Sequence, residues 1–511
     1  MSTSDVNSVN NKREIRGWAF YDWANSAFST TVVTVFFGPF LAALAEQAAD
    51  ANGFLYLGNI PIQYNSFFPY VVSASVLFQV TILPILGALA DYSHLRKKLM
   101  VFFSTLGALT TISMIFIAST DWTGWVWLGA LLFIIANVSF GASIVFYNAF
   151  LPDIASEDRR DQVSTYGWAL GYVGGGLLLL INLLMFAFLQ DSLGQGLVVR
   201  LSLASAGVWW LGFSLITFKA LRSHQKEIYE TEKKTYFTAG FKQLGTLIGV
   251  STSTVAILTL LPLLIPILFA ISTFVTNLPI ILILLPGLGP FIIIVLFGYS
   301  KVTTIPQTIL FLFAYLLYND GVQTVIVVAA IYAKDEVGVS DTFLIVLILF
   351  IQFVGVLGAF FFGWLADKIG NKTAIISSLV VWAFITIYAY VGLKNSSNSP
   401  ILGMPWNQVE LLVLGFLIAI VLGGSQALSR SLFSLIIPKN QETEFFSFYE
   451  VSDKGTSWFG TFLFGIANQF FNSLRVGVLS LIVFFIIGLV ALPFVNVKKG
   501  IEDAKKASET V

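Results

Sequence analysis

The amino-acid sequence predicts an all-α protein that crosses a membrane many times. Hydrophobic residues make up 57% of its 511 residues and charged residues only 11%, against roughly 25% charged in an average soluble domain. Apolar runs long enough to span a bilayer recur along the chain, and basic residues gather in alternate connections between them. So little charge could not cover the surface of a soluble protein, so soluble multidomain enzymes are excluded.

Composition also excludes several partners and cofactors. The 28 Lys and Arg residues balance 28 Asp and Glu residues, so no nucleic-acid partner is expected. Cysteine is absent and there are two histidines, so neither thiolate nor histidine metal sites are expected. No Walker sequence occurs, and we expect no cofactor and no enzymatic activity.

Fourteen runs of about 20 mostly apolar residues are candidates for membrane-spanning helices. Six precede a charged linker at 222–243, two form a hairpin within 244–300, and six follow it. The polar ends are 1–16 and 497–511, and the full-length first run is unlike the short core of a signal peptide. The runs lie near 18–45, 66–90, 99–118, 124–151, 163–189, 198–221, 244–270, 275–299, 305–332, 341–366, 373–393, 409–432, 449–471 and 476–496.

The basic residues predict the orientation of these spans. With both termini in the cytoplasm, the outer connections hold four of the 28 Lys and Arg residues, and the inner ones hold the other 24. This is the asymmetry that the positive-inside rule requires. The four outer residues are Arg200, Lys334, Lys394 and Arg475.

One loop sequence occurs twice. Residues 87–91 and 363–367 both read Gly-x-Leu-Ala-Asp, and a basic residue follows each Asp five positions later. In both places a glycine would permit close helix packing and an aspartate would pair with basic groups of the loop. We therefore expect two equivalent gating loops, with Gly87, Asp91 and Arg96 in the first and Gly363, Asp367 and Lys372 in the second.

The first spans of the two parts also correspond. Asp22 is followed by Asn25, and Asp320 lies between Asn319 and Gln323. Without the hairpin at 244–300, the chain divides into two six-helix bundles, 17–221 and 301–496. Such repeats are typical of secondary transporters.

These features resemble the major facilitator superfamily. Within it, RGWAFYDWANSAFSTT (16–31), FYNAFLPDIA (146–155), STYGWALGYVGGG (164–176), LYNDGVQTV (317–325) and GGSQALSRSLFSLIIP (423–438) are similar to the vacuole-effluxer family. The resemblance covers about 16–242 and 301–496, and the hairpin departs from the family's usual twelve spans. It implies a major facilitator fold of two six-helix halves plus the hairpin, and transport of amino acids.

Ionisable residues within spans are the candidates for solute or proton binding. Asp22 and Asp320, with Asn25, Asn319 and Gln323, would line a central cavity. The alternative is that each Asp only caps the start of a helix. Arg430 could hold a solute carboxylate, or it could anchor its helix by pairing with an acid near the membrane surface.

Two further groups have simpler interpretations. Gly167, Gly171 and Gly175 form a stripe at four-residue spacing, which indicates close helix packing. Glu450, Asp453 and Lys454 form a charged cluster that an ion pair between Glu450 and Lys454 would explain.

The leading functional hypothesis is a secondary active transporter for a small polar solute, an amino acid or short peptide, with protons as the candidate coupling ion. Alternatives are a lipid or amphiphile transporter of the same fold and a membrane receptor or scaffold that does not transport. We expect a monomer in the lipid bilayer of a bacterial plasma membrane.

Overall fold

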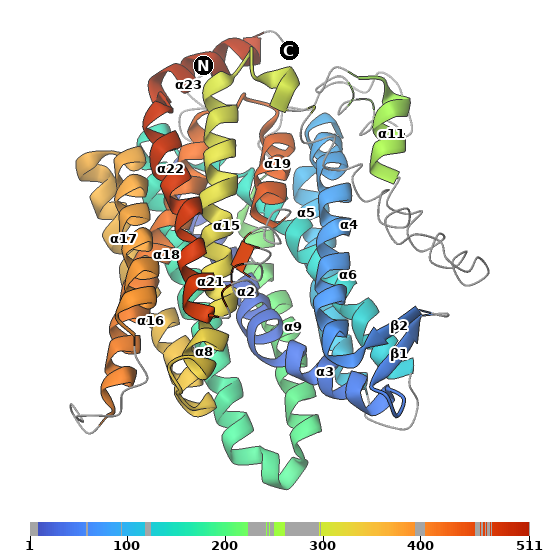
Figure 1. The fold of residues 1–511 in the computed structure, drawn as a ribbon. Coiled ribbons are helices and arrows are strands. Elements are labelled where there is room, and N and C mark those ends of the chain that lie inside the picture. Colours follow the sequence, from blue (N-terminus) through green and yellow to red (C-terminus); the bar gives the residue numbers. More distant parts are fainter. Residues whose placement is uncertain are drawn as a thin grey trace.

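The computed structural model describes most of the chain, and in the described part it is a bundle of long helices with one β-hairpin (Figure 1). The described residues are 9–57, 60–93, 95–117, 124–222, 242, 245, 250–260, 296, 298–393, 404–454, 460, 463, 464, 467, 471 and 473–509.

The N-terminal half begins with one continuous helical segment of three parts. They are α2 (Lys12–Ala27), the π-helical η1 (Phe28–Phe36) and α3 (Phe37–Ala48). An antiparallel hairpin, β1 (Phe54–Leu57) and β2 (Ile60–Gln63), follows and pairs Phe54 with Gln63. The other elements are α4 (Tyr64–Ser93), α5 (Arg96–Ser113), η2 (Met114–Phe116), α6 (Gly124–Asn148), α7 (Leu151–Ile154), η3 (Glu157–Arg159), α8 (Arg160–Leu193) and α9 (Gln195–Ala220).

The C-terminal half repeats this pattern of long helices and ends with a helix on the surface. Between the halves, α11 (Thr252–Leu260) is described within the expected hairpin, most of which lies outside the described residues. The helices of the C-terminal half are α15 (Pro306–Asp335), α16 (Asp341–Ile369), α17 (Asn371–Val391), α18 (Trp406–Leu435), α19 (Glu442–Lys454), α21 (Leu474–Ser480), α22 (Ile482–Phe494) and the terminal α23 (Val497–Glu509).

The prediction of a helical multi-pass membrane protein is confirmed. Within the described residues, 11 helices are long and apolar enough to cross a membrane, and each coincides with one of the expected runs. The count of fourteen stays a prediction, because the two runs of the hairpin and most of the run at 449–471 lie outside the described residues.

Helix α19 begins at Glu442, seven residues before the expected run at 449. Its first turns are polar in sequence and were not recognised as part of a span. In the structure residues 441–453 are buried, since α19 packs against α4 and α6 of the other half. The polar groups of these turns therefore form the interface between the halves.

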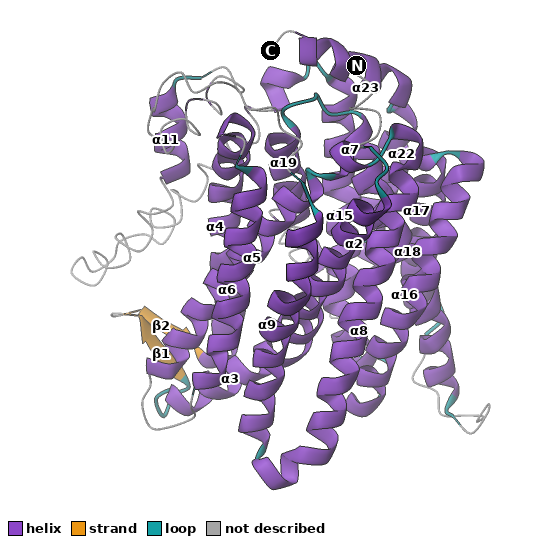
Figure 2. Ribbon diagram, turned by 180° about the vertical axis from the view of Figure 1, so that it is seen from behind, coloured by secondary structure: helices purple, strands orange, loops and turns teal. Residues whose placement is uncertain are grey.

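Both ends of the described chain lie on one face of the bundle, which we call the terminal face (Figures 1 and 2). The halves meet where α8 packs against α16 and α18 and where α4 packs against α19. Helix α23 lies across the terminal face, where the Ser508 hydroxyl accepts a hydrogen bond of 2.8 Å from the backbone amide of Lys439. That the terminal face is cytoplasmic stays a prediction.

Candidate functional site

Arg430, on α18 of the C-terminal half, extends its guanidinium group into the N-terminal half. Its side chain is 4% exposed and forms an ion pair of 3.1 Å with Asp22 on α2. Its Nε donates to the Ser164 hydroxyl at 2.9 Å and its Nη2 to the Ser164 carbonyl at 2.8 Å. Nη1 also lies 3.3 Å from the Asn148 carboxamide oxygen. Each of these partners belongs to the other half of the molecule, so we call this group of contacts the Arg430 bridge.

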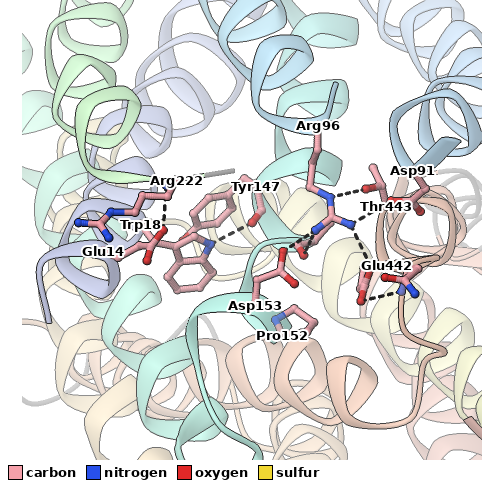
Figure 3. A network of polar contacts seen from close by, with 12 residues as sticks. Glu14, Trp18, Asp91, Arg96, Tyr147, Pro152, Asp153, Arg222, Glu442 and Thr443 are labelled. Carbon is pink, nitrogen blue, oxygen red and sulfur yellow. Dashed lines mark hydrogen bonds and ion pairs between the residues drawn. The ribbon is translucent and has the colours of Figure 1, made fainter. Parts of the chain in front are cut away.

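Aromatic rings enclose the same guanidinium group. Its Cζ lies 4.8 Å from the ring centre of Trp18, 5.6 Å from that of Tyr147 and 5.7 Å from that of Trp168. Trp18 stacks on Tyr147 with centres 4.4 Å apart and donates its indole N–H to the Tyr147 carbonyl at 2.9 Å (Figure 3). These rings form cation–π contacts, which gain strength where water is excluded.

Asp22 is held between helices rather than at a helix start. Helix α2 begins at Lys12 and is capped by Asn11, whose side chain accepts from the amides of Arg13 and Glu14. The alternative that Asp22 caps the helix is therefore wrong. The Tyr147 hydroxyl donates to the Asp22 carboxylate at 2.8 Å, so this acid keeps a second donor besides Arg430.

The glycine stripe of α8 makes room for this face of α2. A Cβ atom on Gly167 would lie 2.6 Å from the Asp22 carboxylate, and one on Gly171 would lie 2.7 Å from the Ser26 hydroxyl. On Gly175 it would lie 3.0 Å from the Thr30 methyl group. The three glycines of α8 thus face the turns of α2 that carry Asp22, Ser26 and Thr30. A larger residue at any of them would displace these side chains.

A second polar group, which we call the Asp453 cluster, lies in the C-terminal half. The Asp453 Oδ1 atom accepts from Asn319 at 2.6 Å, from Tyr315 at 3.2 Å and from Gln323 at 3.4 Å. Gln426 donates to the Asn319 side-chain oxygen at 2.5 Å. Because Gln426 lies one turn before Arg430 on α18, the Asp453 cluster and the Arg430 bridge are neighbours.

Asp320 is buried beside this cluster, at 1% exposure. No side chain of the described residues donates to its carboxylate oxygens, and the backbone of Gly460 lies beside it. Helix α15 begins at Pro306, so Asp320 lies about 20 Å along the helix from its start. Asn25 is buried too, but its amide nitrogen has no hydrogen-bond partner among the described residues.

The first Gly-x-Leu-Ala-Asp loop joins the halves at the terminal face. Arg96, 2% exposed, is the centre of a buried group that we call the Arg96 hub (Figure 3). One of its partners, Asp91, accepts through its Oδ2 atom a second hydrogen bond of 2.8 Å from the backbone amide of Glu444, in the first turn of α19. The Arg96 guanidinium group donates to Asp91 at 2.9 Å, Asp153 at 2.7 Å, Glu442 at 3.0 Å, the Thr443 hydroxyl at 2.7 Å and the Ala149 carbonyl at 2.9 Å.

Two further charged groups, Glu444 and Lys301, lie near the hub. The Glu444 carboxylate is fully buried, and Lys301 precedes α15 nearby. Burial lowers the pKa of the Lys301 ammonium group, and the Glu444 carboxylate opposes that shift. Among the described residues, the Glu444 carboxylate oxygens accept no hydrogen bond, so Glu444 is a buried acid beside the hub rather than a member of it.

The second loop has different partners. Asp367 is exposed and accepts from the Gln162 side chain at 3.1 Å. Lys372 donates to the carbonyls of Pro493 and Val495 at 3.1 and 3.0 Å, which end α22 of its own half. Asn371 donates to Asp161 of the other half, and a Cβ on Gly363 would lie 2.7 Å from the Thr165 hydroxyl.

Sequence reasoning missed the aromatic rings and the role of Asp453. Trp18 and Tyr147 lie inside two of the quoted motifs, next to Asp22 and Asn148, and this proximity was the available signal. Asp453 was attributed to a charged cluster explained by a Glu450–Lys454 pair, and the Lys454 side chain lies outside the described residues. The structure gives Asp453 three side-chain donors, and the Glu450–Lys454 pair stays a prediction. Within the described part, no three His, Cys, Asp or Glu side chains are grouped so as to hold a metal ion.

Comparisons with known proteins agree with the family resemblance of the sequence. The family model described as "Vacuole effluxer Atg22 like" matches residues 10–282 and 295–505. This match includes most of the segment at 244–300, which we expected to depart from the family. An uncharacterized MFS-type transporter of Bacillus subtilis, YxiO, is 27% identical over 489 residues, covering 94% of this chain and 95% of its own. Autophagy-related protein 22 of Coccidioides immitis is 26% identical over 570 residues, covering 98% and 89%.

Solved structures agree on the fold. The proton:xylose symporter XylE superposes with a TM-score of 0.62 at 13% identity, covering 95% of both chains. The transporter FucP in its outward conformation gives 0.60 at 12% identity, covering 95% of this chain and 100% of that one. Identities this low establish the major facilitator fold alone. On the family match, the chain is a transporter rather than an enzyme, and it belongs to the vacuole effluxer Atg22-like family of the major facilitator superfamily.

Proposed function

We propose that this transporter moves amino acids or short peptides by alternating access and couples their movement to protons. The single observation that carries the proposal is the Arg430 bridge, an ion pair between the two halves in which Arg430 is buried and Asp22 is 14% exposed. In alternating access the halves move against each other around a central site. A buried ion pair across that boundary must break in each cycle, and a charged solute can take its place.

The chemistry of the two polar groups favours a small solute with both charges. Arg430 offers a guanidinium group that matches a carboxylate. Asp22 and Asp453 offer carboxylates that match an ammonium group, and the amides of Asn319, Gln323 and Gln426 offer neutral hydrogen bonds. A lipid or amphiphile would need a long apolar surface beside these groups.

Asp320 is the candidate proton site. It is buried within a span, and no described side chain donates to its carboxylate. A buried carboxylate is costly to keep charged, and such acids inside spans commonly carry protons in transporters. We place both termini on the cytoplasmic side of a bacterial plasma membrane, supported by the basic residues of the terminal face and by the Bacillus subtilis relative.

Uptake into proteoliposomes tests the function. The panel holds radiolabelled amino acids, dipeptides and lysophospholipids, with and without a proton gradient. We expect saturable uptake of at least one amino acid or dipeptide, increased by the gradient. Uptake of lysophospholipid alone would overturn the solute class, and no uptake of any member would favour a receptor or scaffold.

The proton role has its own variant. Asp320→Asn keeps the size of the side chain and its ability to form hydrogen bonds but cannot release a proton. We expect it to exchange solute across the membrane yet lose uphill uptake, whereas the control Asp191→Asn, at an exposed position late in α8, keeps both. Unchanged uphill uptake by Asp320→Asn at every pH would reject this role.

A further inference from the structure

The surroundings of the Arg430 guanidinium group form a site for a cation on the N-terminal half. A carboxylate, Asp22, lies 3.1 Å from it, and three aromatic rings lie within 5.7 Å of its Cζ. Carboxylates flanked by aromatic faces are the arrangement with which proteins bind ammonium groups of ligands. Here the cation comes from the protein itself, from the other half of the molecule.

Removing Arg430 would leave this site intact but short of a positive charge. Trp18 stacks on Tyr147 and donates to its carbonyl, and the Tyr147 hydroxyl donates to Asp22. These contacts lie within the N-terminal half and do not depend on Arg430. The Asp22 side chain is only 14% exposed, and a carboxylate so far from bulk water is costly without a cation. A cation that enters when the halves separate is therefore favoured at this place.

We propose that Trp18, Asp22, Tyr147 and Trp168 form the binding site for the ammonium group of the solute, and that Arg430 is its built-in occupant when the terminal face is closed. The inference rests on the proposed function, since it takes the solute to be an amine that crosses between the halves. The solute and Arg430 compete for Asp22. A solute that also carries a carboxylate satisfies Arg430 once it is displaced, so neither charge is left uncompensated.

Competition between Arg430 and the solute predicts a result that a purely structural ion pair between the halves does not. If Arg430 competes with the solute, Arg430→Gln vacates the site and strengthens the binding of a bare amine, by the factor by which the occupant weakened it. If Arg430 only joins the halves, or only binds the carboxylate of the solute, Arg430→Gln does not raise the affinity for a bare amine.

The test uses three probes with the purified full-length protein. L-alanine carries both charges, L-alaninamide only the amine, and N-acetyl-L-alanine only the carboxylate. Binding is followed by tryptophan fluorescence and by the rise in unfolding temperature with ligand. We expect alaninamide to bind at least tenfold more tightly to Arg430→Gln than to the wild type, and to lose binding to Asp22→Asn, while N-acetylalanine follows neither pattern.

Two sets of controls keep the outcome interpretable. Trp168→Leu removes one ring and should weaken alaninamide binding severalfold, while Trp168→Phe keeps an aromatic face and most of the affinity. Asp191→Asn, at an exposed position late in α8, lies outside the proposed site and should leave the affinity for alaninamide at its wild-type value. The exchange Asp22→Arg with Arg430→Asp keeps an ion pair between the halves but should not restore alaninamide binding.

The results separate this inference from the proposed function. Amino-acid transport by the wild type, with no gain of alaninamide binding in Arg430→Gln and equal effects of Trp168→Leu and Trp168→Phe, would overturn the cation site alone. Absence of any amino-acid transport would overturn the proposed function, and the alaninamide titration would still decide whether the site at Asp22 binds amines. If the double variant Asp22→Arg with Arg430→Asp binds alaninamide again, Arg430 and Asp22 serve only as an ion pair that joins the halves.

Discussion

The loop that holds Asp91 and Arg96 and the loop that holds Asp367 and Lys372 occupy equivalent places in the two halves, yet their polar groups have different partners. In the first loop the basic residue is buried and bridges to α19 of the other half. In the second, Lys372 binds carbonyls at the end of α22 in its own half, and Asp367 is exposed. The contacts that hold the halves together are therefore unevenly shared between the repeats.

The difference follows from the residue at the fifth position after each Asp. An arginine offers five N–H donors in a fixed plane, and Arg96 uses them on three carboxylates, a hydroxyl and a carbonyl. A lysine is a single flexible charge, which suits the ends of one helix. A repeat in sequence thus predicts equivalent positions, but the side chains decide which copy joins the halves through its basic residue.

The largest effect that separates the two loops is expected from their basic residues. Arg96→Gln removes the shared cation of the buried Asp91 and Glu442 and the half-buried Asp153, at a cost of about 3–5 kcal/mol to the closed arrangement. Lys372→Gln should cost about 1 kcal/mol, because it removes hydrogen bonds to two carbonyls near the surface. Thermal unfolding in detergent measures both, and equal losses would show that the loops are equivalent.

Substitution of the aspartate should also destabilise the protein more in the first loop than in the second, but the difference should be smaller than for the basic residues. Asp91→Asn removes an ion pair and the charge beside the first turn of α19, worth about 2–3 kcal/mol, while Arg96 keeps two other acids. Asp367→Asn should cost less than about 0.5 kcal/mol, since the exposed side chain can still accept from Gln162. Uptake rates and unfolding temperatures of the pair check this, and a larger loss in Asp367→Asn would contradict it.

Substitution of the glycine in each loop should give the smallest difference in stability between the two loops. A Cβ on Gly87 would lie 2.8 Å from the Thr443 carbonyl oxygen, and one on Gly363 would lie 2.7 Å from the Thr165 hydroxyl. A backbone atom yields less than a side-chain hydroxyl, so we expect about 1–2 kcal/mol for Gly87→Ala and about 1 kcal/mol for Gly363→Ala. The unfolding temperatures of the two variants, with Gly212→Ala in open space as control, measure the difference.

The sequence was most informative where hydrophobicity is repeated over whole spans. The helices from α2 to α9 and from α15 to α18 coincide with the expected runs, because a span needs about 20 apolar residues whatever its partners. The start of α19 was missed because its polar residues are buried against the other half, which no local pattern reveals. The expected hairpin lies mostly outside the described residues, and its role stays a prediction.

The candidate site was predictable only in part. Asp22, Asp320 and Arg430 stood out because charges inside spans are costly. Their partners could not be predicted, since Asp22 and Arg430 are 408 positions apart and meet only through the packing of α2, α8 and α18. Asp453 was hidden for the same reason: its donors come from α15, whereas its sequence neighbours suggested a pair within one helix.

The most direct test of the idea that buried arginines close the terminal face is a distance measurement between the halves. The chain has no cysteine, so spin labels at Lys98→Cys and Lys439→Cys, both exposed on that face, report the separation by pulsed electron paramagnetic resonance. We expect one short distance in the unmodified background and in Lys372→Gln, and a substantial longer population in Arg96→Gln and in Arg430→Gln. An unchanged distance distribution in both arginine variants would contradict the closure that we assign to Arg96 and Arg430.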